Sequence, residues 1–284
     1  MNKKRIFEII GFFGLRVCVY LVFAALLVFL YDIGSKGGAT LSWEFISQAP
    51  RRGMTEGGIF PAILGTLMVT IVTAVLAVPM GMFAAIYLNE YARQNRVTRL
   101  IRLSIRNLSG VPSIVYGLFG VILFVNIMHF GTSILSAGLT LGLMTLPWTI
   151  TASEEALKTV PNSYREGALA LGATKWQAIR TNVLPYAMPG MLTGTVLGLA
   201  RAAGETAPIM FTGAAFYLPI LPKSFLDQFM ALPYHLYVMA TQHHSISQVR
   251  PLAYGTALVL LILILLMNLT VVIVRYRLRR VKRE

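Results

Sequence analysis

Long uncharged runs separated by short charged segments form the main pattern along this chain. The runs cover residues 17–31, 57–89, 107–153, 181–200 and 251–274. A helix needs about 20 apolar residues to cross the hydrocarbon layer of a membrane. As a single helix, residues 107–153 would be about 70 Å long, so this run predicts two spans with a turn at 129–133. The pattern therefore predicts an all-α polytopic membrane protein with six transmembrane helices.

Three segments need further argument. The first span combines Ile9–Leu15 with the run after Arg16, and because no A-x-A-like site follows, an uncleaved helix is favoured over a signal peptide. The fifth span continues past Arg201 and Glu205. Residues 228–249 are also uncharged, but they contain a proline, three histidines and several hydroxyl side chains. This composition predicts an interfacial or a re-entrant segment rather than a seventh span.

The charge content agrees with a membrane protein and gives an orientation. Only 13% of the residues are charged and 56% are hydrophobic, whereas soluble domains have about 25% charged residues. A soluble enzyme and a disordered chain are thereby excluded, and the single cysteine, Cys18, excludes an intrachain disulfide. Most basic residues gather at 3–16, 93–106, 158–180 and 275–283. Because six spans place these segments on one side, the positive-inside rule predicts that both termini are cytoplasmic.

The net charge of +14 is therefore a topology signal spread over four segments, and no nucleic-acid partner is expected. No P-loop sequence is present, so this chain is not expected to bind ATP by that motif. The histidines at 129, 235, 243 and 244 fit no zinc pattern, and we expect no metal site. They are interpreted as interfacial polar residues, with contact to a periplasmic partner as the lesser alternative. Tyr116, Trp148 and Trp176 are interpreted as membrane-interface anchors.

The longest predicted cytoplasmic segment, residues 153–185, carries the strongest motif. Pro161 interrupts the chain, and Ser163 with Glu166 three residues later predicts a capping box at the start of a short helix. Gly172 is expected to end that helix, and Lys175 to begin a second one with Trp176 as an anchor. Two short helices that meet at a glycine outside the membrane would fit a groove on a partner protein.

This segment resembles the signature E-A-A, three residues, G, nine residues, I, one residue, L-P of inner-membrane permeases of ABC importers. The matching positions are Glu166, Gly167, Ala168, Gly172, Leu184 and Pro185. Gly167 replaces the second family residue, and Asn182 replaces the isoleucine. The resemblance implies a coupling helix that docks into a separate ATPase subunit, which binds ATP and magnesium. This chain would then be a non-catalytic subunit with no cofactor of its own.

A second motif narrows the resemblance. Residues 201–208 read R-A-A-G-E-T-A-P, which is similar to the R-x-x-G-E-T-A-P signature of PstA-type phosphate permeases. Segments 55–59, 112–118 and 232–233 also resemble that family. The resemblance implies a MetI-like core at residues 61–284 after an N-terminal helix and periplasmic segment at 1–60. It also implies a bacterial inner-membrane location, a PstC-like permease, a PstB-like ATPase dimer and a PstS-like periplasmic phosphate-binding protein.

Arg201 and Glu205 are the residues of the fifth span that bear on its chemistry. A charged side chain near the membrane centre costs about 2.5–3.5 kcal/mol on insertion scales, so such residues are functional by default. At positions i and i+4 they would share one helical face, together with Gly194 and Gly198, which would leave room beneath the arginine. Either the pair is a structural ion pair beside a packing seam of Gly190, Gly194 and Gly198, or Arg201 binds substrate.

A substrate role would suit phosphate. A guanidinium binds tetrahedral oxyanions through two parallel hydrogen bonds, and a carboxylate can only accept, so Glu205 would favour an anion that carries a P–OH group. Thr206, in the same motif, and Ser109 and Ser113, beside Pro112, complete the candidate pathway, although the two serines fit kink packing equally well.

The residues alone leave two other functions open: a permease for another oxyanion such as sulfate or molybdate, and a stand-alone secondary carrier. Paired broken helices in two repeated halves, which a carrier would show, are not found in the sequence. An intramembrane enzyme would need a nucleophile or metal cluster facing the pair, and none is found.

Overall fold

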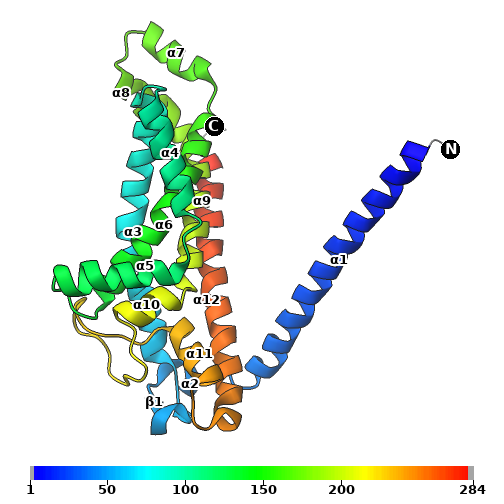
Figure 1. The fold of residues 1–284 in the computed structure, drawn as a ribbon, viewed down its shortest axis with the longest axis vertical. Helices are drawn as coiled ribbons and strands as arrows, with labels where there is room; N and C mark the ends of the chain where they lie inside the picture. Colours follow the sequence, from blue (N-terminus) through cyan, green and yellow to red (C-terminus); the bar gives the residue numbers. More distant parts are fainter. Residues whose placement is uncertain (1–2, 281–284) are drawn as a thin grey trace.

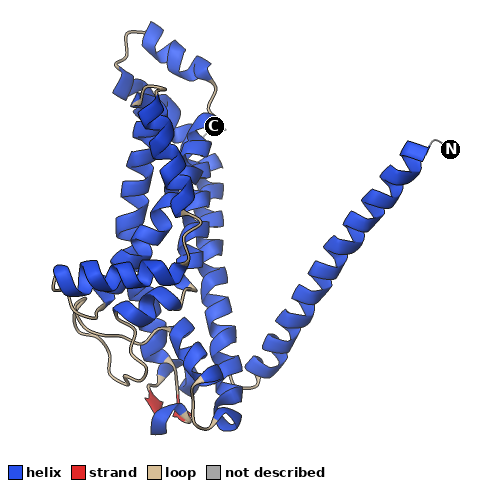
Figure 2. Ribbon diagram, in the orientation of Figure 1, coloured by secondary structure: helices blue, strands red, loops and turns tan. Residues whose placement is uncertain are grey.

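The computed structural model describes residues 3–280, and almost all of its regular structure is helical (Figures 1 and 2). Among these residues, five helical segments are long and apolar enough to cross a membrane, and a bent helix pair supplies a sixth. The long helices are α1 (Lys3–Gly38), α3 (Phe60–Ile86), α6 (Ile134–Lys158), α9 (Leu184–Ala203) and α12 (Ile246–Arg280). The predicted fold class is confirmed.

The third predicted span is bent, not straight. It consists of α4 (Arg96–Leu108) and α5 (Ser113–Gly120), which continues through the π-helical segment η3 (Val121–Ile127), and the two halves differ in direction by 100°. Pro112 precedes α5 in an extended conformation and has no N–H to continue a helix. The hydroxyl of Tyr116 spans the bend and donates to the carbonyl of Leu108 at 3.1 Å. In Figure 1, α5 lies across the bundle while α4 runs along it.

The fifth predicted span is broken at the residues of the phosphate-permease motif. Helix α9 ends at Ala203, and the short helix α10 (Ala207–Thr212) begins after three intervening residues. Gly204 caps α9, and Pro208 can stand only in the first turn of α10 because it lacks an N–H. The prediction that one continuous helix passes through Arg201 and Glu205 is therefore wrong.

The core of the bundle is the close packing of α3, α6 and α9. One buried cluster joins Val69 of α3, Leu141 of α6 and Ala202 of α9, and it also includes Tyr116 and Ile209 from the two interrupted spans. Helix α1 contacts α12 near Gly37 and then diverges from the body, and its apolar side chains from residue 11 to residue 29 are exposed (Figure 1). These surfaces fit a lipid or protein environment rather than water.

One end of the bundle carries the outer module, which we define as residues 39–59 and 213–245. It contains α2 (Trp43–Ser47), the antiparallel pair β1 (Pro50–Arg51) and β2 (Glu56–Gly57) joined by η1 (Arg52–Met54), and α11 (Leu232–Thr241). The region predicted to be interfacial or re-entrant thus contains a short helix, which packs on α12 and α3.

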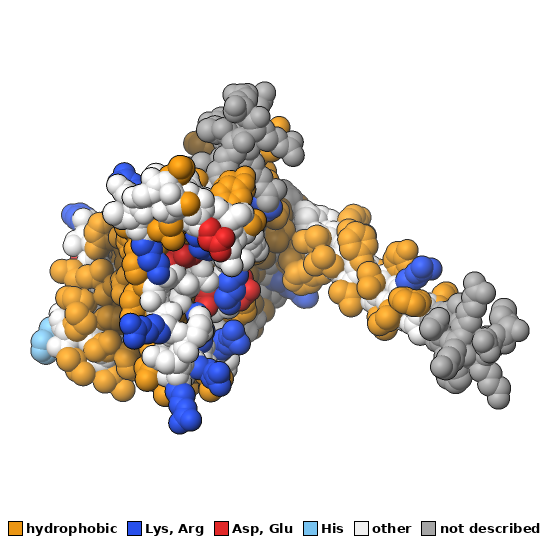
Figure 3. All heavy atoms as spheres, turned by 90° about the horizontal axis from the view of Figure 1, so that it is seen from above, with side chains coloured by type: hydrophobic (Ala, Val, Ile, Leu, Met, Phe, Trp, Pro, Cys, Tyr) orange, Lys and Arg blue, Asp and Glu red, His pale blue; other side chains and the backbone are white. Residues whose placement is uncertain are grey.

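The other end carries π-helical η2 (Tyr87–Tyr91), α7 (Asn162–Ala170), α8 (Lys175–Ala178) and π-helical η4 (Ile179–Val183). The described C-terminal part of α12 points the same way in Figure 1. Seen from this end, Lys and Arg side chains gather over the face and hydrophobic side chains cover the flanks (Figure 3). Of the basic clusters, residues 281–283 lie outside the described part of the chain.

Candidate functional site

The loop at 153–185 forms the two predicted short helices. The prediction that Gly172 ends the first is confirmed, because it adopts a left-handed φ of +85° just after α7. The predicted capping box at Ser163 and Glu166 is wrong, because α7 begins at Asn162 after Pro161. The capping box instead starts α8, where the backbone N–H of Thr174 donates to Gln177 Oε1 and the N–H of Gln177 donates to Thr174 Oγ1.

Most of the signature residues in this loop are exposed. Glu166, Gly167, Gly172 and Pro185 are exposed, Leu184 is half-buried, and Ala168 is buried. Beyond the end of α7, Leu171 is 91% exposed. Because an exposed leucine at the tip of a protruding helix pair has no packing role within the chain, this surface is a candidate docking site for another protein.

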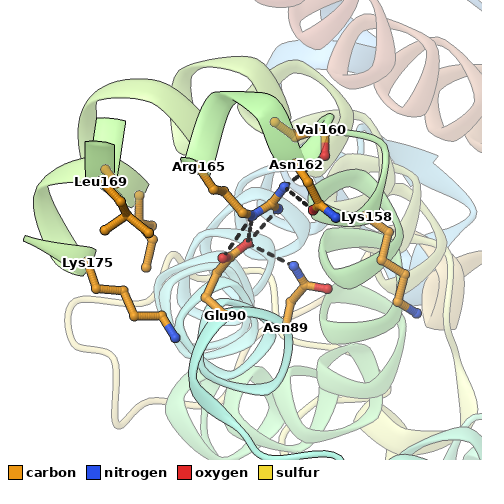
Figure 4. Close-up of a pocket in the computed structure, with 10 residues that line it drawn as sticks. Asn89, Glu90, Lys158, Val160, Asn162, Arg165, Leu169 and Lys175 are labelled. Carbon is orange, nitrogen blue, oxygen red and sulfur yellow. Dashed lines mark hydrogen bonds and ion pairs between the residues drawn. The ribbon is translucent and has the colours of Figure 1, made fainter. Parts of the chain in front are cut away.

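An ion pair that the sequence did not predict holds α7 to the bundle. Arg165 of α7 points at Glu90 of η2, with Nη2–Oε1 at 2.7 Å and Nε–Oε2 at 3.1 Å (Figure 4). The same guanidinium donates from Nη1 to the carbonyl of Val160 and from Nη2 to that of Leu157, at the end of α6. One side chain therefore joins α3, through η2, with α6 and α7. A planar fork with several donors is needed for this arrangement.

Glu90, Arg165 and Lys175 line a cavity of about 460 Å³ between η2 and α7. The Glu90 side chain is only 5% exposed and that of Arg165 is 19% exposed, so the pair is largely shielded from water. Tyr164, next to Arg165, donates to or accepts from the hydroxyl of Tyr186 in α9. Helix α7 is thus attached to α3 and to α9 by separate contacts.

A second shielded ion pair lies beside the first. Arg102 of α4 pairs with Glu154 of α6, with Nε–Oε1 at 2.8 Å, and Nη2 donates to the carbonyl of Leu88. The Glu154 side chain is 7% exposed. The arginines at 96, 99, 102 and 106 lie along one face of α4, and within residues 3–280 only Arg102 among them makes an ion pair.

The break between α9 and α10 contains the predicted Arg201–Glu205 pair in an unexpected setting. Arg201 lies in the last turn of α9, and its Nε is 3.4 Å from Oε1 of Glu205, which stands in the break before α10. The arginine side chain is 53% exposed, and that of Glu205 is 16% exposed. The guanidinium also lies over the ring of Trp148 in α6, with Cζ 5.2 Å from the ring centroid. Trp148 lies near the middle of α6, and its predicted role as an interface anchor stays a prediction.

The glycines of α9 serve packing. A Cβ at Gly190 would lie 2.9 Å from Cβ of Ala156, and one at Gly194 would lie 2.2 Å from Cβ of Ala152. A Cβ at Gly198 would lie 3.1 Å from Cγ2 of Thr145. The predicted small-residue seam is confirmed, but Gly194 and Gly198 face α6. They leave no room for a substrate beneath Arg201, because α6 fills that space.

The remaining candidate pathway residues lie at the two helix interruptions. Ser113 begins α5, and Thr206 precedes α10; the two helices pack so closely that a Cβ at Gly117 would lie 3.0 Å from Cα of Pro208. Ser109 donates to the carbonyl of Ile105 at 3.5 Å. Within residues 3–280, no hydrogen bond joins Ser109, Ser113 or Thr206 to Arg201 or Glu205. Their role in a pathway stays a prediction.

Comparison with known proteins gives the class. Residues 77–283 match the family described as "Binding-protein-dependent transport system inner membrane component", and the chain belongs to this family. In fold it is similar to a chain in the crystal structure of a bacterial ABC transporter involved in the import of the acidic polysaccharide alginate. That likeness has a TM-score of 0.66 at 15% identity and covers 96% of this chain and 99% of the other.

Two sequence relatives have names that indicate a more specific family than the fold does. The chain is 37% identical over 220 residues to the phosphate transport system permease protein PstA 1 of Mycobacterium tuberculosis (strain CDC 1551 / Oshkosh), covering 78% of this chain and 71% of the relative. It is 35% identical over 210 residues to a probable phosphate transport system permease protein PstA of Methanocaldococcus jannaschii, covering 74% and 73%. The predicted resemblance to PstA-type permeases is confirmed.

Proposed function

We propose that this chain is the PstA-type membrane subunit of an ATP-driven phosphate importer and forms half of the translocation pathway. The relatives named for phosphate transport support the substrate, and the family supports the role of a permease. The finer proposal is that Arg201 binds phosphate within the membrane and that Glu205 holds this arginine when no phosphate is present.

The observation that carries this proposal is the position of Arg201 at the break between α9 and α10. Its Nε edge contacts Glu205, the only ion-pair partner it has among residues 3–280, and the side chain is 53% exposed. A cation held by only one carboxylate retains donors for a second anion. Phosphate binds a guanidinium better than an anion with a single acceptor atom does, because two phosphate oxygens can accept two parallel N–H hydrogen bonds.

Glu205 supplies the argument for phosphate against sulfate. Its carboxylate repels a fully deprotonated anion, but it accepts a hydrogen bond from a P–OH group. Inorganic phosphate carries such a group near pH 7, and sulfate does not. An anion that displaces Glu205 from Arg201 can therefore keep a favourable contact with the carboxylate only if it is protonated.

The energy would come from partner chains. We propose a second, PstC-like permease across the pathway, a PstB-like ATPase dimer that binds ATP and magnesium, and a PstS-like periplasmic phosphate-binding protein. The exposed surface of α7 and Leu171 would dock on the ATPase, with both termini on the same cytoplasmic side. Arg165 would then transmit movement of α7 to α3 and α6 through its contacts with Glu90 and with the carbonyl of Leu157 in α6.

The test is uptake by the complete complex in proteoliposomes, with ATP inside the compartment that contains the ATPase. We expect phosphate to enter only with ATP hydrolysis, and a hundredfold excess of sulfate or molybdate to leave the rate unchanged. Uptake that is insensitive to ATP depletion would support a stand-alone secondary carrier. ATP-dependent uptake of sulfate in preference to phosphate would support a permease for another oxyanion.

A further inference from the structure

Trp148 and Arg201 lie on neighbouring helices at a point where α9 has no side chain to separate them. Gly198 stands three residues before Arg201, and a Cβ there would lie 3.8 Å from Cβ of Trp148. Residues 190 and 194 keep the two helices equally close further along the seam. No side chain therefore separates the two residues, and the ring of Trp148 lies against the guanidinium one turn later.

The contacts of the guanidinium divide between its face and its edges. Trp148 covers one face, with Cζ 5.2 Å from the ring centroid, and Glu205 contacts the Nε edge. Within the described residues 3–280, the two terminal nitrogens make no hydrogen bond. These nitrogens are the donors that would bind two oxygens of an oxyanion side by side.

Glu205 and Trp148 would respond differently when phosphate binds to Arg201. Glu205 bears a negative charge and competes with phosphate for the same donors. Trp148 is uncharged and attracts the cation through the negative face of its ring, without occupying any N–H group. Trp148 can therefore hold the guanidinium in place both before and after phosphate displaces Glu205.

We propose that Trp148 is a positioning residue for phosphate binding, which keeps the free edge of Arg201 turned toward the pathway. This proposal rests on the proposed function of Arg201. An arginine without this platform would have to lose its rotational freedom when it binds phosphate, so affinity for phosphate would fall. The indole would affect KM for transported phosphate more than the maximal rate, since Trp148 lies near the middle of α6, away from the α7 surface proposed to dock on the ATPase.

The test compares Trp148→Tyr, Trp148→Phe and Trp148→Leu in the complete complex, with assembly verified by co-purification. A cation over an aromatic ring is stabilised most by Trp and by smaller amounts with Tyr and Phe, so KM should rise in that order. For Trp148→Leu we expect a rise of about 3- to 30-fold, with the ATP hydrolysis rate at saturating phosphate within about twofold of wild type. Trp43→Leu, at an 82% exposed tryptophan of the outer module, is the matched control and should leave KM unchanged.

Each of the following outcomes overturns the proposal. If Phe and Leu raise KM equally, or if only assembly and the maximal rate change, Trp148 serves packing alone. If all three variants keep the wild-type KM while Arg201→Ala loses uptake, Trp148 has no part in binding although the proposed function stands. Full uptake by Arg201→Ala would overturn the pathway role of Arg201, and the positioning role of Trp148 with it.

Discussion

Arg201, in the last turn of α9, has two neighbours that act differently. Glu205 partly neutralises it at a Nε–Oε1 distance of 3.4 Å, and the ring of Trp148 covers one face. Sequence spacing correctly predicted the ion pair, but it could not predict the tryptophan. Trp148 is 53 positions earlier in the chain, and only the packing of α6 on α9 brings it to the arginine.

Replacement of Glu205 tests the selectivity argument at the residue scale. In Glu205→Gln, the side-chain amide can both donate and accept, so fully deprotonated anions are no longer repelled. We expect inhibition of phosphate uptake by sulfate to become measurable, with the sulfate inhibition constant falling about tenfold or more, as expected from loss of one unfavourable charge contact. The measurement is phosphate uptake by the complete complex over a series of sulfate concentrations.

Asp227→Asn is the control. The Asp227 carboxylate accepts hydrogen bonds from the N–H groups of Lys223 and Ser224 in the outer module, and none of these bonds involves Arg201. Equal sulfate inhibition in Glu205→Gln and wild type would contradict the role given to Glu205.

At the scale of elements, α7 is fixed by contacts that lie outside its signature motif. The motif residues Glu166 and Gly167 face outward, whereas Arg165 points back to Glu90 and to the end of α6 (Figure 4). Glu90 is the first charge after the second apolar run, and its position at the end of that run is the only signal the sequence offered. Its partner 75 positions later required the fold.

Breaking this ion pair should separate ATP hydrolysis from transport. Glu90→Gln leaves a shielded arginine without its counter-ion, and the loss of one partner from a buried pair costs about 3–5 kcal/mol. We expect phosphate uptake per ATP hydrolysed to fall at least tenfold, because α7 can then move without α3. Uptake and hydrolysis measured on the same proteoliposomes give this ratio.

The control for this prediction is Glu155→Gln. Its ion pair with Lys158 is exposed, with side chains 61% and 40% exposed, and such a pair contributes about 0–1 kcal/mol. An unchanged ratio of uptake to hydrolysis in Glu90→Gln would contradict the coupling role of the pair.

The close packing of α9 on α6 at the glycines of α9 can be tested by its effect on stability. In Gly194→Ala the new methyl carbon would lie 2.2 Å from Cβ of Ala152, so the helices must separate, at a cost of about 1–3 kcal/mol. Adding Ala152→Gly should restore most of this loss, because it removes the atom in conflict. Thermal unfolding of the purified complex measures both variants.

Gly14→Ala is the matched control, because a Cβ at this glycine of α1 has no neighbour within 4 Å. If the double variant is no more stable than Gly194→Ala alone, the close contact of these two helices is not what the glycine serves.

At the scale of the whole molecule, the number of spans and the grouping of basic residues could be predicted from composition and run lengths. The bend between α4 and α5 and the break between α9 and α10 could not be predicted in this way. The uncharged run from Asn107 correctly predicted part of the third span. That span begins earlier, in the arginine-bearing α4, and turns by 100° at Pro112. The charges of α4 and the proline at 112 do not predict the angle of this bend from the sequence, because the direction of α5 depends on its packing against α10.

The outer module carries a pH dependence of its own. Burial, with a smaller contribution from nearby His243, lowers the pKa of His235 to about 4, and its Nδ1 makes no hydrogen bond among the described residues. In the unfolded chain a histidine titrates near 6.5, so between about pH 6.5 and 4 the unfolded state binds more protons. Stability should therefore fall as pH decreases through this window, by up to about 3 kcal/mol.

Thermal unfolding of the purified complex between pH 7.5 and 4.5 measures this slope. We expect His235→Gln to remove most of the contribution of this residue, and His129→Asn, at an exposed histidine, to retain it. Equal pH dependence in His235→Gln and wild type would show that burial of this histidine does not couple folding to pH.

The most direct test of the central claim is phosphate uptake by the reconstituted complex with Arg201→Ala and Arg201→Lys, each with assembly verified. A lysine keeps the charge but cannot bind two oxygens side by side, so both variants should lose uptake by about 10- to 100-fold. Arg52→Ala, in η1 of the outer module, should retain uptake. Wild-type uptake by both Arg201 variants would contradict a role for this arginine in phosphate binding.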